Sequence, residues 1–399
     1  MLCCVLSVFI SCGEKIQTPK DEPTPQTLIV YMVGTDLSWA FDQNKRDIKS
    51  ALSKNIKGQS RVIIVSHSNK MTLNAVELEY VDGEIKEKKD FATYNLPVEM
   101  DESSLGYIFN DITSRAPATT YGLIIGSHGW GWIPWSDYYT QIENNGATKS
   151  EMRHLDITLP REYVTRFLGE KSTLSNTFDI TTLSKALHAT GKKFEYILFD
   201  ACFMGNVETA YDLRNNTKYI VASLCEIMGW GFPYQKTLPY LLQNGGKAYD
   251  LNLAAKSFNE HYKAVRDSGS DLYSGSVAVI NCAELEALAQ KMLKVNQNLS
   301  DEVNEKRLQT YDGGANHLFY DLGDYVNEVC TDETCKKEFT QQLEFTIPHK
   351  YTLSAFWSGY FKVGSYPIDT EAFSGITTSA PSKLCRESYP QTAWYKATH

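Results

Sequence analysis

The sequence predicts an α/β fold in which a mainly parallel sheet is flanked by helices on both faces. Short apolar runs rich in β-branched residues have the composition of strands that are buried on both sides. These runs alternate with amphipathic, helix-like stretches, which is the order of a parallel sheet with crossover helices. The chain has 399 residues, of which 42% are hydrophobic and 22% charged, so it is large and apolar enough to bury a substantial core.

The first half of the chain carries the regular part of this pattern. Right-handed crossovers would bring the carboxyl ends of the parallel strands to one edge of the sheet. A hairpin is expected over 73–88, because the dipeptide Asp82-Gly83 favours a tight turn. The buried strands are expected at 27–33, 61–68, 121–128, 196–202 and 218–223, and the helices at 38–56, 104–115, 180–189 and 204–213.

The second half is less regular and predicts a separate region. We expect an α/β unit over 27–240 and, packed on it, a C-terminal helical and small-sheet region over 241–399. The segment 129–178 is a long connection without clear periodicity, and such loops are typically lids, processing sites or binding loops. In the C-terminal region we expect helices at 249–266, 283–300 and 317–345, a strand at 274–281 and strand-like segments from Tyr351 onward.

The N-terminus carries targeting information. Residues 1–12 read MLCCVLSVFISC, an apolar run too short to span a bilayer. The run resembles a bacterial lipoprotein signal peptide that is cut before Cys12, whose thiol is then lipidated, although it lacks the usual Lys or Arg. Residues 13–26 contain three prolines and predict a stiff tether. These features predict a lipid-anchored protein of the cell envelope (outer membrane or cell surface) or a secreted one; the alternative is a disordered N-terminus in the cytoplasm.

Charge and motif content exclude several function classes. The net charge is −9 and no basic cluster is present, which disfavours nucleic-acid binding. No P-loop, strand-linked GxGxxG or GxSxG elbow occurs, so nucleotide chemistry and serine hydrolysis have no support. The cysteines form no CxxC pair and the histidines show no metal-ligand spacing, so no metal or other cofactor is expected. No feature predicts an oligomeric state.

Two strand ends carry residues suited to nucleophilic catalysis. His128 ends the apolar run of 121–128 and is followed by Gly129, whereas Asp200 and Cys202 end the run of 196–202. Sites in open α/β sheets form outside the carboxyl ends of the strands, so we expect these residues at the same edge. A cysteine nucleophile and a histidine base must meet in space although they are distant in sequence.

The chemistry has specific requirements that these residues meet. The thiolate is the nucleophile, and a helix beginning directly after Cys202 would stabilise it through oriented N–H groups. A histidine such as His128 can act as a general acid and protonate a leaving amine. Gly129 lacks a side chain, so its N–H can approach a developing oxyanion. Each residue also has a structural alternative: Cys202 as a small core residue, His128 as a turn residue and Asp200 as a helix cap. The joint pattern favours catalysis.

The blocks around His128 and Cys202 resemble the caspase-like clan of cysteine peptidases, and in detail the clostripain family. The similar segments run from 28 to 398: LIVYMVGTDL, PATTYGLIIGSHGWGW, FDITTLSKAL, FDACFMGNVETAYDLRN, VASLCEIMGWGFPY, YDLGDYV and YPQTAWYKAT. The resemblance implies a caspase-like catalytic domain over 27–240 and a cysteine endopeptidase that acts on polypeptides. It further implies a catalytic dyad of His128 and Cys202, with the N–H groups of Gly129 and Cys202 as the oxyanion hole.

The resemblance also implies substrate preference and activation. Asp200 matches an acidic position of the primary specificity pocket and Glu226 is its candidate partner, which together imply cleavage after Arg or Lys. Several family members cut themselves between the His and Cys strands, and Lys149 and Arg153 are the candidate cut sites here. The alternative function is a non-catalytic surface lipoprotein of the same fold that binds peptides or partner proteins.

Overall fold

The computed structural model describes most of the chain after residue 23. The predicted signal peptide with Cys12, most of the tether, the turn dipeptide at 82–83 and the candidate cut sites Lys149 and Arg153 lie outside the described residues. The described ranges are 24–55, 60–81, 84–97, 100–134, 137, 178–243, 247–300, 303–313, 316–359 and 363–399.

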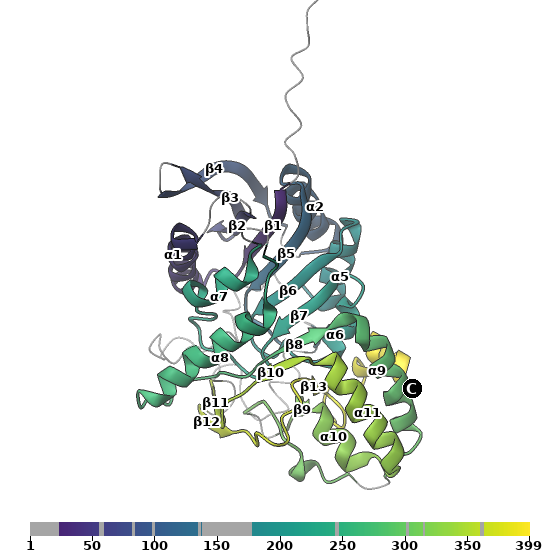
Figure 1. Ribbon diagram of the computed structural model, residues 1–399. Helices are drawn as coiled ribbons and strands as arrows, with labels where there is room; N and C mark the ends of the chain where they lie inside the picture. The colour runs from purple at the N-terminus through teal and green to yellow at the C-terminus, as the bar shows by residue number, and fades with distance from the viewer. Residues whose placement is uncertain are drawn as a thin grey trace, which may run out of the picture.

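A nine-stranded sheet forms the centre of the fold, in the order β10-β8-β7-β6-β5-β1-β2-β3-β4 (Figure 1). Its five central strands pair in parallel, as the apolar runs predict. The sequence neighbours β1 and β2 lie on one side of β5, and β6 and β7 on the other. These strands are β1 (Thr24–Met32), β2 (Ser60–Asn69), β5 (Ala118–Gly126), β6 (Phe194–Asp200) and β7 (Thr217–Ala222).

Antiparallel strands complete both ends of the sheet. At one end β3 (Thr72–Val81) and β4 (Glu84–Asn95) pair with each other, as the predicted hairpin requires, and β3 pairs with β2. At the other end β8 (Val277–Asn281) pairs with β7, and β10 (His349–Tyr351) pairs with β8. Two strands from the C-terminal half therefore extend the same sheet.

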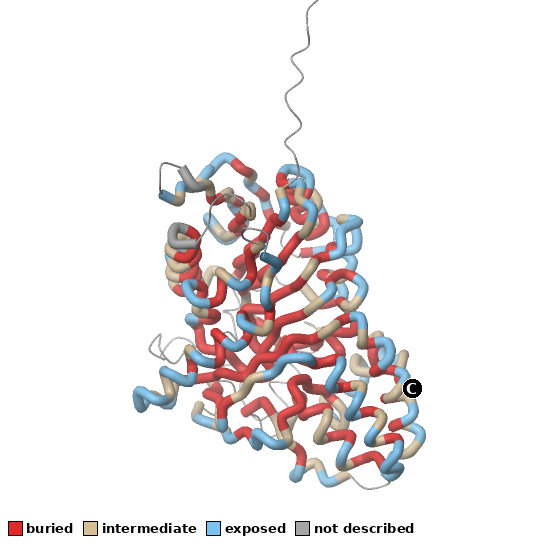
Figure 2. The backbone as a smooth tube through the Cα atoms, viewed as in Figure 1, coloured by how far each residue is buried: buried red, intermediate tan, exposed pale blue. Residues whose placement is uncertain are grey.

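Helices cover both faces of the sheet, which confirms the predicted fold class (Figure 1). Because the chain winds outward from β1 and from β5 in opposite directions, the crossover helices fall on opposite faces. The strands between them are almost wholly buried (Figure 2). One face carries α1 (Ser38–Asn55), α7 (Tyr234–Leu241) and α8 (Leu251–Asp267), and the other α2 (Glu102–Arg115), α5 (Ile180–Ala189) and α6 (Val207–Leu213).

The C-terminal region departs from the sequence prediction in one respect. The single helix predicted over 317–345 is wrong: α10 (Leu322–Val329) and α11 (Glu333–Thr346) are separate helices. Asp321 caps the start of α10 and Asp332 the start of α11, each by accepting hydrogen bonds from backbone N–H groups of the first turn. The helical pattern is therefore interrupted between Val329 and Glu333. The remaining elements are α9 (Leu285–Asn296), α12 (Ala393–Thr398), β9 (Tyr320–Asp321), β11 (Ala355–Ser358), β12 (Gly364–Pro367) and β13 (Thr377–Thr378).

Within the described residues, none of the helices combines the length and apolar character needed to cross a bilayer. The six cysteines in this part of the chain are buried free thiols.

A buried carboxyl group joins α6 to the C-terminal region. Glu208 Oε1 accepts hydrogen bonds from the Ser379 N–H at 2.8 Å and the Thr378 hydroxyl at 2.9 Å. Glu208 Oε2 has no hydrogen-bond partner among the residues that the structure describes. Burial raises the pKa of Glu208 from 4.5 to about 7, so the folded protein holds this proton more tightly than the unfolded chain does.

We expect the stability of the protein to fall as pH rises between about 4.5 and 7, partly because of Glu208. The carboxyl group has a higher pKa in the folded protein than in the unfolded chain. Its contribution to stability is therefore complete below the pKa of the unfolded chain and is lost as pH rises through the pKa of the folded protein. The loss is roughly 3 kcal/mol for a shift of this size. Urea denaturation across this pH range should show this loss of unfolding free energy in the wild type and not in Glu208→Gln. Parallel curves for the two proteins would contradict the assignment.

Candidate active site

The exits of β5 and β6 lie directly against each other. The register pairs Gly126 with Asp200, and the next residues carry His128 and Cys202. A Cβ atom built on Gly129 would lie 2.3 Å from the Cys202 carbonyl oxygen and 2.9 Å from the Cys202 nitrogen. Only glycine fits such a close approach of two backbones. The structure therefore brings the predicted histidine and cysteine loops together at one sheet edge.

A carboxylate that sequence reasoning missed orients the imidazole. His128 Nε2 lies 2.8 Å from Asp36 Oδ2, in the loop between β1 and α1. Because an ionised carboxylate only accepts hydrogen bonds, this contact places the ring proton on Nε2. The other ring nitrogen, His128 Nδ1, is buried and has no hydrogen-bond partner in the described part of the chain. Nδ1 is therefore the nitrogen available to exchange a proton with a neighbouring group.

The rule that sites form outside the carboxyl ends of parallel strands identified His128 and Cys202, and it would also have identified Asp36. Asp36 follows the carboxyl end of β1, which pairs with β5, so it reaches the same edge of the sheet. The run TLIVYMVGTD ends in an acidic residue just as the other two runs end in His128 and Cys202.

The Cys202 sulfur lies buried against the chain that leaves β7. Cys202 is 0% exposed, and its Sγ accepts a hydrogen bond from the Ile227 N–H at 3.2 Å. The predicted helix start at residue 204 is wrong, since α6 begins at Val207. Asn206 caps that helix and also donates to the Phe203 carbonyl at 2.7 Å, which holds residues 203–206 outside it. The N–H group at the sulfur therefore comes from Ile227 and not from a helix beginning directly after Cys202.

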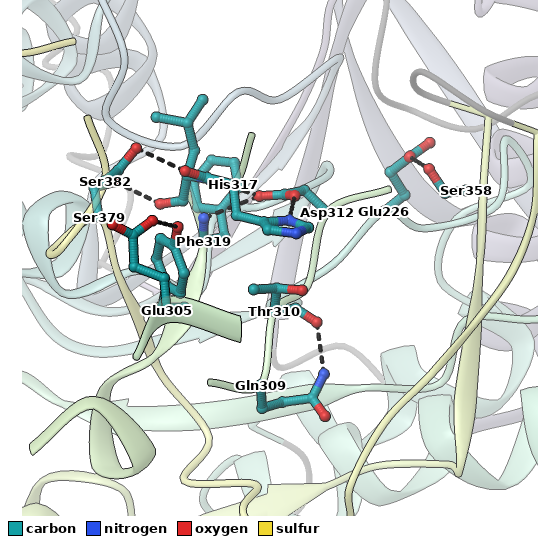
Figure 3. Close-up of polar contacts among 12 residues, drawn as sticks. Glu226, Glu305, Gln309, Thr310, Asp312, His317, Phe319, Ser358, Ser379 and Ser382 are labelled. Carbon is teal, nitrogen blue, oxygen red and sulfur yellow. Dashed lines mark hydrogen bonds and ion pairs between the residues drawn. The ribbon is translucent and has the colours of Figure 1, made fainter. Parts of the chain in front are cut away.

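Both predicted acidic residues are buried and hydrogen-bonded. Asp200 accepts hydrogen bonds from the Phe232 N–H at 3.1 Å and the Tyr234 hydroxyl at 2.7 Å. It does not cap α6, because Asn206 fills that role. Glu226 accepts a hydrogen bond from the Ser358 hydroxyl (Figure 3). It accepts another from the Gly359 N–H at 3.1 Å.

One stretch of chain holds the sulfur and contains or contacts both carboxylates. Residues 226–234, here called the 226–234 segment, supply Glu226 itself, the Ile227 N–H for the sulfur, and the Phe232 and Tyr234 donors for Asp200. The position of this segment therefore determines the environment of all three groups. The sequence suggested only Glu226 from this stretch.

Aromatic rings from three parts of the chain join the two loops. Phe203 and Phe319 stack in parallel with ring centroids 4.7 Å apart, and Trp130 meets Phe203 edge-on at 5.8 Å and Phe319 at 5.9 Å. We call these three residues the aromatic bridge. Phe203 directly follows Cys202 and has a φ of 58°, an unfavourable value for a side chain of this size. The bridge therefore packs both loops against the C-terminal region.

A polar network fixes Phe319 in the bridge (Figure 3). Buried Asp312 accepts hydrogen bonds from the N–H groups of Leu318 at 2.8 Å and Phe319 at 3.0 Å. Asp312 also lies 2.5 Å from His317 Nδ1. Burial lowers the pKa of His317, but the hydrogen bond and charge of Asp312, with the charge of Glu305, outweigh it and raise the pKa overall.

A second polar link anchors the histidine loop to the same region. Trp132 donates through its indole N–H to the Ser379 hydroxyl at 2.7 Å, and that hydroxyl donates to the Leu318 carbonyl at 2.8 Å. The C-terminal region is thus in contact with both loops, through rings and through hydrogen bonds. Within the ranges described, no group of three or more His, Cys, Asp or Glu side chains is arranged to hold a metal ion.

Comparisons with known proteins identify a family and related folds. The model of the clostripain family matches residues 30–344. The X-ray structure of "iotapain", a secreted C11 cysteine protease from Bacteroides thetaiotaomicron, is 33% identical, with a TM-score of 0.80 over 95% of this chain and 100% of that one. An inactive zymogen C11 protease from Parabacteroides distasonis shares the fold at 23% identity, with a TM-score of 0.74 over 95% of this chain and 99% of that one.

A further solved relative matches part of the chain. A clostripain from B. thetaiotaomicron ATCC 29148, in complex with the peptide inhibitor BTN-VLTK-AOMK, is 37% identical, with a TM-score of 0.50 over 56% of this chain and 95% of that one. A search of curated proteins gives no significant match.

We expect loss of the Phe319 ring to loosen the cysteine loop. Phe319→Ala removes a fully buried ring that packs on Phe203, at a cost of about 3–5 kcal/mol. Iodoacetamide should then modify Cys202 at least about tenfold faster than in the matched control Phe339→Ala, which empties an equally buried site in α11. Equal rates in the two variants, with similar unfolding free energies, would refute a specific role for the bridge.

Proposed function

The chain belongs to the clostripain family of cysteine peptidases, and from this premise we propose that it is an endopeptidase in which Cys202 is the nucleophile and His128 the general acid and base. The observation that carries the proposal is the packing of the Gly129 backbone on Cys202, which brings the loop of Cys202 against the loop of His128, whose Nδ1 is unpartnered in the described chain. A Cys–His peptidase requires this adjacency.

The proposed reaction follows from the hydrogen bonds of these groups. His128 Nδ1 accepts the thiol proton of Cys202, and the sulfur attacks the carbonyl carbon of the scissile bond. The N–H groups of Gly129 and Cys202 stabilise the oxyanion that forms. The protonated imidazole then gives its proton to the leaving amine, which leaves a thioester on Cys202. Water, deprotonated by His128, hydrolyses the thioester and restores the thiol.

Asp36 is the proposed positioning residue of this dyad. Its carboxylate keeps the proton on His128 Nε2, so that the lone pair of Nδ1 can accept the thiol proton. It also stabilises the imidazolium that forms when the thiol is deprotonated.

Cleavage after Arg or Lys is the proposed specificity, with Asp200 and Glu226 as the acidic groups. Glu226 lies in the 226–234 segment and Asp200 is hydrogen-bonded to it, and both carboxylates are buried. Two such carboxylates favour a cationic side chain over a neutral or acidic one. The inhibitor in the related clostripain has a peptide that ends in lysine, which supports this preference. The substrate side chain would replace some of the present donors to these carboxylates.

Self-cleavage at Lys149 or Arg153 is the proposed activation step. The Cys202 sulfur is fully buried, so a polypeptide can reach it only after part of the surrounding chain moves. A cut between the His and Cys strands would remove the covalent link between the two loops and so allow such a movement.

The proposed location is the cell envelope or the exterior. Lipidation of Cys12 would anchor the chain through the tether predicted over 13–26, of which residues 24–26 form the start of β1, ahead of a catalytic domain over 27–240 and the C-terminal region over 241–399. The secreted relative from B. thetaiotaomicron supports an extracytoplasmic setting. Loss of membrane association in Cys12→Ser, with the wild type in the membrane fraction, is the test of the anchor.

A library of peptides with Arg, Lys or neutral residues before the cleaved bond tests the enzymatic proposal. The wild type should cut after Arg or Lys, and neither Cys202→Ala nor His128→Ala should retain measurable activity. Mass spectrometry should find a chain break after Lys149 or Arg153 in the wild type and an intact chain in Cys202→Ala. Absence of cleavage by folded wild-type protein, together with binding of the same peptides, would favour the alternative, a non-catalytic peptide-binding surface lipoprotein.

We expect Asp36→Asn to lower kcat by about 10²-fold and leave KM nearly unchanged, because the imidazole loses its orientation and not its contact with substrate. Asp42→Asn is the matched control, since Asp42 pairs with Lys45 on the exposed surface of the neighbouring helix. The kinetics of single-turnover acylation measure the effect. An unchanged kcat would remove Asp36 from the mechanism.

A further inference from the structure

A cavity of about 430 Å³ is lined by residues of the 226–234 segment, of α1, of the C-terminal half of α8 and of the loop after it. Its size falls within the range of ligand sites in proteins. Aromatic and aliphatic side chains form most of its wall, with Asp47 as its one acidic lining residue. The apolar lining includes Trp230, Phe232, Tyr262, Val265 and Leu272.

The cavity wall is held in place by hydrogen bonds. The Asn44 side chain donates to the Trp230 carbonyl at 2.9 Å, and the Tyr262 hydroxyl donates to the Gly231 carbonyl at 2.8 Å. Trp230 also packs edge-on against Trp39, with ring centroids 4.6 Å apart, and remains 44% exposed. The cavity is therefore preformed and borders solvent at Trp230.

The same segment links this cavity to the sulfur of Cys202. Ile227 donates to Cys202 Sγ, and the next residue, Met228, already lines the cavity. Trp230 is three positions after Ile227, and three residues of extended chain span at most about 10 Å. Phe232 also lines the cavity and donates to Asp200, the proposed partner of the basic residue before the cleaved bond. The cavity therefore lies on that side of the bond, and an extended peptide would pass it about two to four residues before the bond.

We propose that this cavity is a subsite for an apolar side chain of the polypeptide substrate, two to four residues before the cleaved bond. The proposal rests on the endopeptidase function proposed above. It adds a second requirement, an apolar residue at a set distance, to the basic residue at the cleavage point.

The charges around the cavity favour this occupant. Asp47 Oδ1 already accepts hydrogen bonds from the side chains of Gln43 and Gln235, each at 2.8 Å. Burial and the nearby charge of Lys236 lower the pKa of His261, so it is neutral at pH 7 and does not attract anions. An acidic side chain would meet Asp47 without a compensating cation among the lining residues, whereas an apolar one would remove the aromatic wall from water.

Paired peptides and a filled cavity test the subsite. All peptides carry the same basic residue before the cleaved bond. One set has Leu or Phe, and the other Ser or Asp, at each of the second to fourth positions before that bond. A short reporter with only the basic residue lacks any group that could reach the cavity. The wild type should show a kcat/KM about 10–100-fold higher for the best apolar peptide than for its polar match.

Val265→Trp should fill the cavity from α8, and Ala264→Trp is the matched control on the exposed neighbouring position. Val265→Trp should reduce the apolar preference to about 1–3-fold and leave the short reporter unchanged, while Ala264→Trp keeps the preference. Leu272→Glu, in the loop after α8, is a second variant. It places a charge in the cavity and should also abolish the preference for apolar peptides.

The outcomes separate the two proposals. If the wild type cleaves the short reporter but shows no apolar preference, or if the filled variants keep that preference, the subsite is refuted and the peptidase stands. Reporter cleavage that rises or falls when a free apolar compound is added, with no preference among the peptides, would make the cavity an effector site and also refute the proposal. If folded wild type does not cleave the reporter, the peptidase proposal fails.

Discussion

The close approach of Gly129 to Cys202 is the constraint on which the rest of the site depends. With less than 3 Å between a Cβ at position 129 and two backbone atoms of Cys202, any side chain there would push the β5 and β6 exits apart. The histidine and the cysteine come from strands about seventy residues apart in sequence, yet their separation is set by backbone contact. A site built on backbone contact tolerates little movement, which suits chemistry that needs reacting atoms in near contact.

The remainder of the molecule supports this contact from two sides. The aromatic bridge packs Trp130 and Phe203 against Phe319, so the histidine loop and the cysteine loop both pack on the same residue of the C-terminal region. Asp312 holds the backbone of Phe319 through two N–H groups. The C-terminal region therefore contributes to the geometry of the site although it supplies neither proposed dyad residue. A catalytic unit cut at residue 240 would lose Phe319 and with it the link between the loops.

Most of the fold was predictable from the sequence because buried parallel strands leave a strong local pattern. The five apolar runs, the hairpin and the adjacency of two strand exits follow from periodicity and crossover handedness. Asp36 was within reach of the same rule. Phe319 was not, since its role comes from contacts with Phe203 and Trp130, each over a hundred positions away. Asp312 matters because it holds the backbone of Phe319, so its role could not be predicted either. The late start of α6 and the break between α10 and α11 depend on single capping side chains, which outweigh helical periodicity.

The buried sulfur limits where activation can act. The Cys202 backbone is fixed by Gly129 on one side, and its Sγ is held by the Ile227 N–H on the other. Because the backbone contact leaves no space, exposure of the sulfur requires a rotation of the side chain away from Ile227 or a shift of the 226–234 segment. That segment also binds Asp200 through Phe232 and forms the wall of the apolar cavity. In the proposed endopeptidase, a peptide that fills the cavity would press on the same chain that covers the sulfur, so one short segment would couple substrate binding to access to the nucleophile.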